Sequence, residues 1–423
     1  MELEELFVRF ERCCRRNGQG VSFDAASFDD LFDILVHKWE FDVSVTLEDR
    51  ERLTRAAVFS AARKGPLTHK SFKDVMARAV QEFDASPKKD YRLLASVGVP
   101  WGGRTPKVRL DGASIRFLAH RPDQFDLTFI ENVTPKPKVL AASRYTHVVV
   151  GLKARSPSEA YDVAMRALDF VRACWSFRLN KTRGRQWHSN SNAPLSPIAL
   201  GPIQTLHYPN GDPAIQRVWF DPFFGSSSES PNVSVKMEDC VDEFARIRKL
   251  IARYSFGPDI VNLMVRHVRA LDSRDPAAAF LELWSALEHL TGTSKKNNQE
   301  TVKRGTFIYA DGAIETALLE VMRSRRNEFV HSAWRDGASR EAASVLNVFV
   351  CDLVLFLIRN GRRFGSLAEF QAFLDLSRDE SRLSVETRLR QLALRMRSGG
   401  RRQRSSAENL NGASAHHLVS NGS

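Results

Sequence analysis

The strongest helical pattern in the chain runs through residues 275–360, and it constrains the fold more than any other feature. Asp275 followed by Pro276 is typical of a helix start, because an aspartate caps free backbone N–H groups and a proline fits the first turn. Gly292 is a typical helix stop. Between these signals, apolar side chains recur at the spacing of one helix face: Phe280, Leu283, Trp284, Leu287 and Leu290.

Two more helices are expected in the same stretch. The first begins after Gly312 and carries the short motif Arg326-Asn327-x-x-x-His331 at its C-terminal end. The second is nearly all apolar from Val345 to Ile358. A helix that is apolar on every side is buried, so we expect this one at the centre of an all-α bundle.

The side chains of the motif suit RNA cleavage without a metal ion, which needs a base, an acid and positive charge at the phosphate. Imidazole titrates near neutral pH, so His331 is the candidate base or acid. A guanidinium stays charged and forks onto two phosphate oxygens, so Arg326 is the candidate electrostatic stabiliser. Asn327 lies four residues before His331, on the same helix face, where it can orient the ring or hold a phosphate.

The spacing of the motif raises a geometric difficulty. At about 100° per residue, Arg326 and His331 lie roughly 140° apart around a straight helix. Either the helix ends or bends before His331, or a second chain completes the site. A symmetric dimer brings two arginines and two histidines to one cleft, where one His331 can act as base and the other as acid.

The three helices and the motif together resemble the HEPN superfamily, small helical bundles whose catalytic members carry Arg-Asn-x-x-x-His. Phe280–Leu290 resembles the first core helix of the branch called Apea-like, and the likeness covers roughly residues 236–360. The resemblance implies a metal-independent endoribonuclease without a cofactor, acting on RNA as a homodimer or higher homo-oligomer. It also implies a role in bacterial antiviral defence or as a toxin.

Alternatives to catalysis remain open at this point, and one of them is a bundle that pairs with a nucleotidyltransferase, although the chain carries no transferase signature. His331 can stabilise the helix dipole as an ordinary C-terminal residue, and Arg326 can form a salt bridge with Glu288. Glu288 can also point into the cleft and position Arg326 for catalysis. The chain as a whole can instead be a non-catalytic nucleic-acid-binding or scaffold protein whose bundle dimerises, as in HEPN relatives that lack the motif.

The composition divides the chain into units and predicts an α+β multidomain fold. Residues 1–85 carry helical patterns, and residues 86–231 carry β-rich runs that predict a mixed α/β middle domain. A serine- and proline-rich linker ends the middle domain, and the HEPN-like helical bundle is expected over residues 232–397. Residues 398–423 contain scarcely any apolar side chains, so we expect a disordered basic tail.

The expected elements follow from periodicity and capping signals. The N-terminal unit should have helices at residues 1–16, 29–39, 46–64 and 68–83. The middle domain should have a helix at 156–177 and strands at 91–97, 107–110, 115–119, 126–131, 145–153, 203–207 and 216–220. The bundle should begin with helices at 237–254 and 259–271.

The formal charge of +12 favours polyanionic partners, because binding to phosphates releases counterions. One stretch, residues 180–196, places basic side chains beside an aromatic ring, a combination that suits single-stranded RNA. Its candidate RNA contacts are Lys181, Arg183, Arg185 and Trp187. A surface loop of this composition needs no ligand, and that interpretation remains open.

The five cysteines give neither a disulfide framework nor a metal-ligand spacing, so we expect no metal site and a reducing, cytoplasmic location. The N-terminus has acidic residues and no apolar signal-peptide region. The longest hydrophobic run, Val348–Ile358, is too short to span a bilayer, so no membrane is expected as a partner. No glycine-rich mononucleotide-binding loop is present either.

Overall fold

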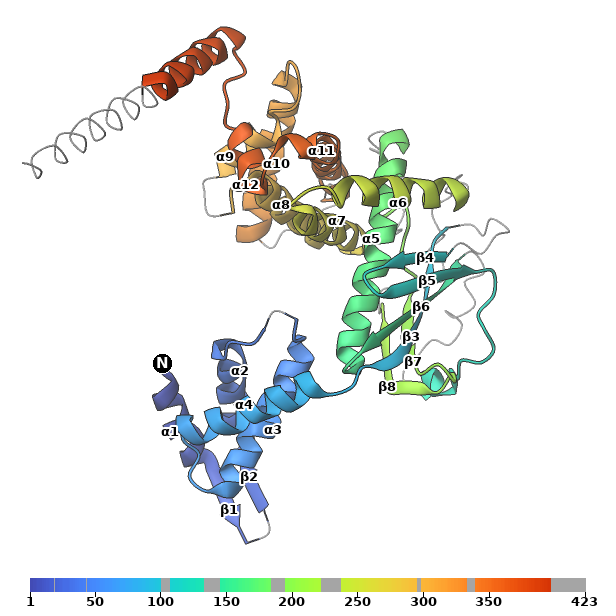
Figure 1. The fold of residues 1–423 in the computed structure, drawn as a ribbon, viewed down its shortest axis with the longest axis vertical. Coiled ribbons are helices and arrows are strands. Elements are labelled where there is room, and N and C mark those ends of the chain that lie inside the picture. The colour runs from blue at the N-terminus through green and yellow to red at the C-terminus, as the bar shows by residue number, and fades with distance from the viewer. Residues whose placement is uncertain are drawn as a thin grey trace, which may run out of the picture.

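The computed structural model describes residues 1–18, 20–42, 44–99, 107–132, 145–183, 195–221, 237–294, 298–332 and 339–396. The described chain is a mixed α+β protein in which helices predominate. An N-terminal helical unit, a six-stranded sheet and a C-terminal group of helices follow one another in space as they do in sequence (Figure 1). The expected tail, residues 398–423, lies outside the described residues.

The N-terminal unit contains α1 (Leu3–Cys13), α2 (Ala25–Lys38), α3 (Leu47–Lys64) and α4 (His69–Ala85). Thr46 and Thr68 cap α3 and α4 by accepting hydrogen bonds from backbone N–H groups, as their sequence signals predict. Tightly packed aromatic side chains form a core that belongs to this unit alone; they include Phe7, Phe10, Phe28 and Phe72.

One expectation for this unit was wrong. The first helix does not reach Arg16 but ends at Cys13, and a hairpin of β1 (Cys14–Asn17) and β2 (Gly20–Phe23) follows. The hairpin places the ring of Phe23 against Phe28 at a centroid distance of 4.8 Å. The packing of Phe23 therefore favours a hairpin at residues 14–23, although the helical pattern of the preceding residues continues to Arg16.

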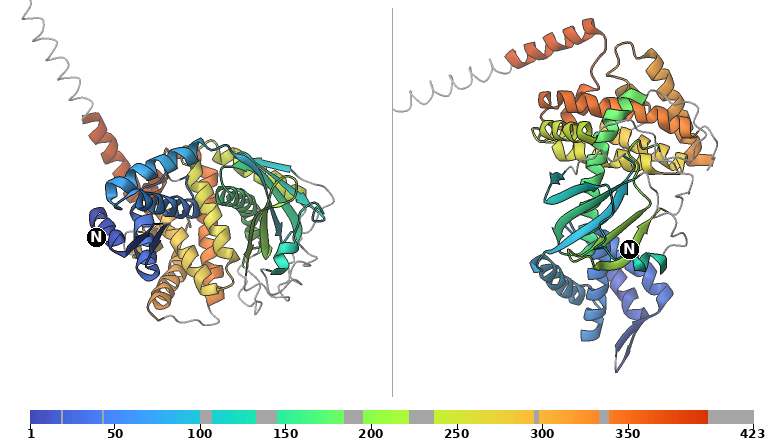
Figure 2. Two further views of the ribbon diagram at one scale, coloured as in Figure 1. Left: turned by 90° about the horizontal axis from the view of Figure 1, so that it is seen from below. Right: turned by 90° about the vertical axis from the view of Figure 1, so that its right-hand side faces the viewer.

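The middle of the chain forms an antiparallel sheet with the strand order β4-β5-β6-β3-β7-β8. The strands are β3 (Lys89–Val97), β4 (Lys107–Leu110), β5 (Ala113–Leu118), β6 (Thr146–Ala154), β7 (Ile203–His207) and β8 (Pro213–Phe220). The sheet curves around the long helix α5 (Pro157–Arg183), which packs on its inner face (Figure 2).

A strand expected at residues 126–131 is instead the 3₁₀ helix η1 (Thr128–Asn132). The cause is local, because Asp126 accepts hydrogen bonds from both the backbone N–H and the hydroxyl of Thr128. This turn lets Phe125 and Leu127 pack onto the outer face of the sheet against Leu94 and Val149.

The C-terminal helices are α6 (Met237–Ile251), α7 (Gly257–Asp272), α8 (Pro276–Thr291), α9 (Asn298–Gly305), α10 (Ala313–Ser332), α11 (Ser339–Asn360) and α12 (Leu367–Phe373), with η3 (Gly361–Arg363) between the last two. A further helix covers residues 380–396 and projects from the bundle (Figure 1). Helix α8 has the predicted boundaries: Asp275 caps its N-terminus, and Gly292 ends it in the left-handed conformation. Helix α11 has a largely buried surface and packs beside α8.

Helix α9 was not predicted from the sequence. Val302 is its only buried apolar side chain, so the sequence shows no apolar period, and polar contacts hold the helix as well. Arg304 is buried, and its Nε donates to Asp375 at 2.6 Å while its Nη1 donates to the carbonyl of Thr291 at 2.6 Å. These contacts tie α9 to the end of α8 and to the segment after α12.

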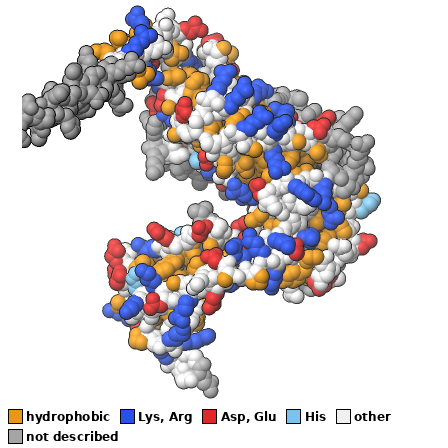
Figure 3. Space-filling view, viewed as in Figure 1, with side chains coloured by type: hydrophobic (Ala, Val, Ile, Leu, Met, Phe, Trp, Pro, Cys, Tyr) orange, Lys and Arg blue, Asp and Glu red, His pale blue; other side chains and the backbone are white. Residues whose placement is uncertain are grey.

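The sheet and the C-terminal helices share one continuous hydrophobic core, whereas the N-terminal unit has its own. Helix α5 joins them, since it packs on the sheet at one end and on α7 at the other. The boundary expected between residues 231 and 232 lies outside the described residues. In the view of Figure 3, a wide gap separates the N-terminal helices from the C-terminal bundle.

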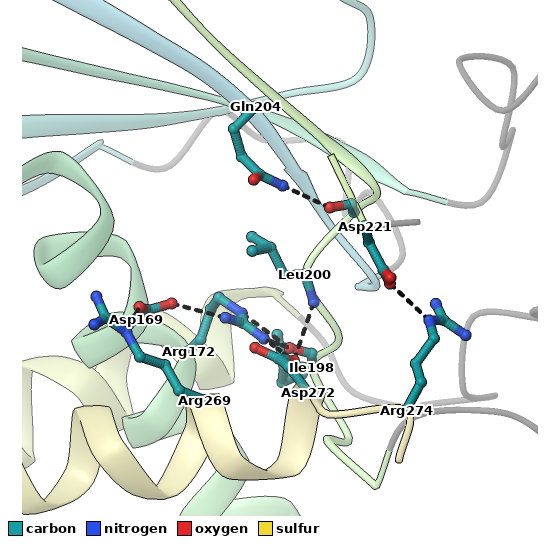
Figure 4. A network of polar contacts seen from close by, with 10 residues as sticks. Asp169, Arg172, Ile198, Leu200, Gln204, Asp221, Arg269, Asp272 and Arg274 are labelled. Carbon is teal, nitrogen blue, oxygen red and sulfur yellow. Dashed lines mark hydrogen bonds and ion pairs between the residues drawn. The ribbon is translucent and has the colours of Figure 1, made fainter. Parts of the chain in front are cut away.

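A buried charge network reinforces the junction between α5 and α7 (Figure 4). Arg172 is fully buried, and its guanidinium contacts Asp169 at 2.8 Å, Asp272 at 2.5 Å and the carbonyl of Ile198. Arg269 holds the second oxygen of Asp169 at 2.7 Å. These charges are paired and hydrogen-bonded, as buried charges must be.

Candidate active site

The Arg-Asn-x-x-x-His motif lies within one continuous helix. Helix α10 begins after Gly312, whose φ of 66° requires the left-handed conformation, and it extends to Ser332. Leu319 and Met322 are buried on the side that faces the bundle. The helix therefore does not end before His331.

Arg326 is partly buried and forms no ion pair with any residue in the described ranges. Its one described polar contact is a long one, 3.5 Å from Nη1 to Oδ1 of the neighbouring Asn327. One turn earlier, Arg323 is engaged by Glu320 at 2.7 Å. Among the described residues, no carboxylate competes with an anion for the guanidinium of Arg326.

The C-terminal end of α10 is fixed by an aromatic contact. Phe329 packs edge-on against Phe280 of α8, with the ring centroids 5.1 Å apart. Asn327 is also partly buried, and its side-chain oxygen lies 3.5 Å from Nδ2 of Asn298 at the start of α9. The candidate site therefore lies where α8, α9 and α10 meet, and Asn298 is a neighbour that the sequence pattern did not indicate.

Glu288 does not hold Arg326 in the described structure. Its Oε1 instead accepts a hydrogen bond of 2.7 Å from the indole Nε1 of Trp284, one turn earlier in α8. Both the expected salt bridge and the expected positioning contact with Arg326 are therefore absent among the described residues. The apolar body of Trp284 is buried, and its N–H needs an acceptor, which explains why Glu288 turns towards it.

The remaining predicted residues are only partly described. The backbone of His331 belongs to α10, but its side chain lies outside the described residues. Lys181 and Arg183 belong to the last turns of α5, again without described side chains. Arg185 and Trp187 lie in residues 184–194, outside the described ranges. The predicted RNA-contact stretch therefore stays a prediction.

Metal ligands do not gather anywhere in the part of the chain that the structure describes, where no group of three or more His, Cys, Asp or Glu side chains could hold an ion. One segment, Ser339–Arg363, is long and apolar enough to cross a membrane by length and composition. Within it, 67% of the most apolar window is buried inside the protein. A core helix of a soluble bundle has the same properties, so this segment is weak evidence for a membrane.

A group of basic side chains on the sheet was not predicted from the sequence. Lys107, Arg109 and Arg116 project from the outer faces of β4 and β5 at alternate positions. The detectable signal was the alternation of basic and apolar residues along these strands, which places every charge on one face.

The chain matches no protein-family model, no curated protein and no solved structure. The resemblance to the HEPN superfamily therefore depends on the residues of α8, α10 and α11 themselves.

Proposed function

We propose that this protein is a metal-independent endoribonuclease of HEPN type that cleaves RNA in a cleft between two copies of the chain. Arg326 binds the scissile phosphate, and His331 transfers protons. Asn327 orients the imidazole or holds a phosphate oxygen. The observation that carries the proposal is the guanidinium of Arg326, which is partly accessible and has no carboxylate partner among the described residues.

The guanidinium of Arg326 differs from those of several other arginines in having no carboxylate partner among the described residues. Two other partly buried arginines of the described chain are paired, Arg274 with Asp221 and Arg323 with Glu320. An arginine that keeps its charge uncompensated at a helix junction is suited to receive a phosphate, with which it can form two parallel hydrogen bonds.

The chemistry needs two proton transfers around one phosphorus atom. A base takes the proton of the 2′-hydroxyl, whose oxygen then attacks the phosphorus. The bond to the 5′-oxygen breaks, and an acid supplies the proton that this leaving oxygen needs. The products are a 2′,3′-cyclic phosphate and a free 5′-hydroxyl, and no electron donor or metal ion takes part. Arg326 lowers the energy of the doubly charged phosphorane.

Helix α10 is continuous through Ser332, so one copy of the chain presents Arg326 and His331 roughly 140° apart. A two-fold axis near the end of α10 resolves this difficulty. The arginine of one copy and the histidine of the other can then reach the same phosphate. One His331 acts as the base and its symmetry mate as the acid. The proposal therefore includes a homodimer, and it extends to a cytoplasmic defence or toxin role that should appear as toxicity on expression.

The proposal is tested by incubating purified full-length protein with RNA in the presence of EDTA. Arg326→Ala and His331→Ala should each abolish cleavage, with a loss of about 100-fold or more. Arg323→Ala is the matched control, since Arg323 lies on the same helix but is already paired with Glu320. Cleavage that needs a divalent ion, or that survives both substitutions, overturns the proposal.

The second candidate is a non-catalytic nucleic-acid-binding protein that uses the same bundle to dimerise. It is favoured by the unbroken course of α10, in which residues 326 and 331 lie at different positions around the helix axis. In the same assay, this function predicts equal RNA binding by the wild type and by both variants, without cleavage by any of them.

A further inference from the structure

The outer face of the six-stranded sheet carries an open pocket of about 680 Å³. It lies on the middle part of the chain and includes no residue of α8, α9 or α10. Most of the charged side chains that line it are basic: Lys88, Arg92, Lys107, Arg116 and Lys153.

The register of the strands concentrates these charges. Lys107 of β4 lies directly opposite Arg116 of β5 in the antiparallel ladder. Like charges in this position repel each other and cost stability, because the two Cβ atoms are only about 5 Å apart. Both side chains are exposed, and neither forms an ion pair with a described residue. An anion bound between Lys107 and Arg116 would offset this repulsion.

A glycine in the next strand shapes the floor of the pocket. Gly151 of β6 pairs with Ser114 of β5 on one side and with Arg92 of β3 on the other. A Cβ atom at position 151 would come within 3.0 Å of Nη1 of Arg92, so the guanidinium lies flat across the strand. Nη1 donates to the carbonyl of Tyr91 at 2.8 Å, which fixes the side chain. Arg92 has no carboxylate partner in the described chain.

The neighbouring acids do not neutralise this charge. Asp90 is within ion-pair distance of Lys153, at 3.9 Å, and Asp111 lies in the turn between β4 and β5. Lys88, Arg92, Lys107 and Arg116 remain without acidic partners among the residues described. Phe125 and Leu127 cover another part of the outer face, at Leu94 and Val149. Among the described residues, the open part of this face is therefore the basic pocket.

We propose that this pocket binds a ligand that carries two or more adjacent phosphate groups. Guanidinium and ammonium groups spread over neighbouring strands can contact several phosphate oxygens at once, and the hydroxyl of Ser114 can donate a further hydrogen bond. No aromatic side chain is among the described residues that line the pocket, so it offers charge rather than stacking. The phosphates can come from a free nucleotide or from the backbone of an RNA strand.

The test measures binding and does not use cleavage, so its outcome is independent of the proposed nuclease activity. Isothermal titration calorimetry is carried out on full-length protein carrying Arg326→Ala, with three probes: inorganic triphosphate, ATP and a short single-stranded RNA. Arg92→Gln and Arg116→Gln should each weaken binding about tenfold, since each removes a charge-assisted contact. Gly151→Ala should weaken it as well, because the new methyl group displaces the guanidinium of Arg92.

Lys73→Gln is the charge-matched control, because Lys73 is an exposed side chain of α4 in the N-terminal unit. Loss of folding does not confuse the test, since Arg116→Gln removes a like-charge repulsion and should leave the melting temperature unchanged or raised. Triphosphate or ATP binding that is lost in the pocket variants identifies a free ligand, and RNA binding alone identifies a strand. Absence of binding to all three probes, or binding that changes equally in Lys73→Gln and in the pocket variants, overturns the proposal.

Discussion

The carboxylate of Glu288 accepts a hydrogen bond of 2.7 Å from the indole of Trp284, and Arg326 is left without a carboxylate partner among the described residues. Had Glu288 paired with Arg326, a phosphate would have had to displace a carboxylate before it could bind. The observed arrangement avoids this competition. Glu288 therefore stabilises the fold by accepting from a buried indole N–H, and it does not need to take part in binding RNA.

Glu288→Gln should therefore leave RNA cleavage nearly unchanged, within about threefold. The glutamine oxygen can still accept from Trp284, and only the strength of a charge-assisted bond is lost, about 1 kcal/mol. Cleavage rates and thermal unfolding of the variant are compared with those of the wild type. A loss of cleavage as large as that of Arg326→Ala, with unchanged melting, would assign Glu288 a direct role in positioning Arg326.

The proposed dimer predicts complementation between two inactive variants. When Arg326→Ala and His331→Ala proteins are unfolded together and refolded, mixed dimers should contain one arginine and one histidine in the shared cleft. Cleavage should then exceed that of either parent by about tenfold or more, because the cleft regains the arginine that one parent lacks and a proton-transferring histidine that the other lacks. A mixture of Arg326→Ala with the double variant is the control, as it cannot regain an arginine. Equal, negligible activity in both mixtures would speak against a shared cleft.

Some features of the fold could be predicted from sequence because their causes are local. Thr46 and Asp275 cap the helices that follow them, and these helices begin where the capping signals placed them. The course of α9 could not be predicted, since Arg304 is held by Asp375, far away in the sequence. For the candidate site, the residues on α10 could be chosen from the motif. The hydrogen-bond partner of Glu288 could not be predicted, because the indole of Trp284 and the guanidinium of Arg326 are both donors that suit a carboxylate.

The buried pair of Arg172 and Asp169 makes a prediction about the junction between α5 and α7. Arg172→Met should lower the free energy of unfolding by about 3–5 kcal/mol, because it leaves Asp169 and Asp272 facing each other without their shared cation. Arg269→Gln is the control, since the Arg269 side chain is 54% exposed and its loss should cost less than about 1 kcal/mol. Denaturant unfolding followed by circular dichroism gives both values. Equal effects of the two substitutions would contradict this assignment of the network.

The imidazole of His267 should make stability depend on pH. It is buried between α7 and α11, where Nε2 donates to Oδ1 of Asn347 at 2.6 Å and the ring stacks on Phe177. Nδ1 is buried without a hydrogen-bond partner. Burial lowers the pKa of His267 from 6.5 to about 4, because a charged ring loses its hydration there. Between these two values the unfolded chain binds the proton more tightly than the folded one.

The contribution of His267 to stability should therefore be complete above pH 6.5 and should be lost as the pH falls through about 4, a decrease of about 3 kcal/mol. The measurement compares the free energy of unfolding of the wild type and of His267→Gln at several values between pH 7 and pH 4. Glutamine can still donate to Asn347 but does not titrate, so the difference between the two proteins isolates the imidazole from the carboxylates that protonate in the same range. A difference that stays constant across this interval would show that the ring is accessible to protons in the folded protein at its ordinary pKa.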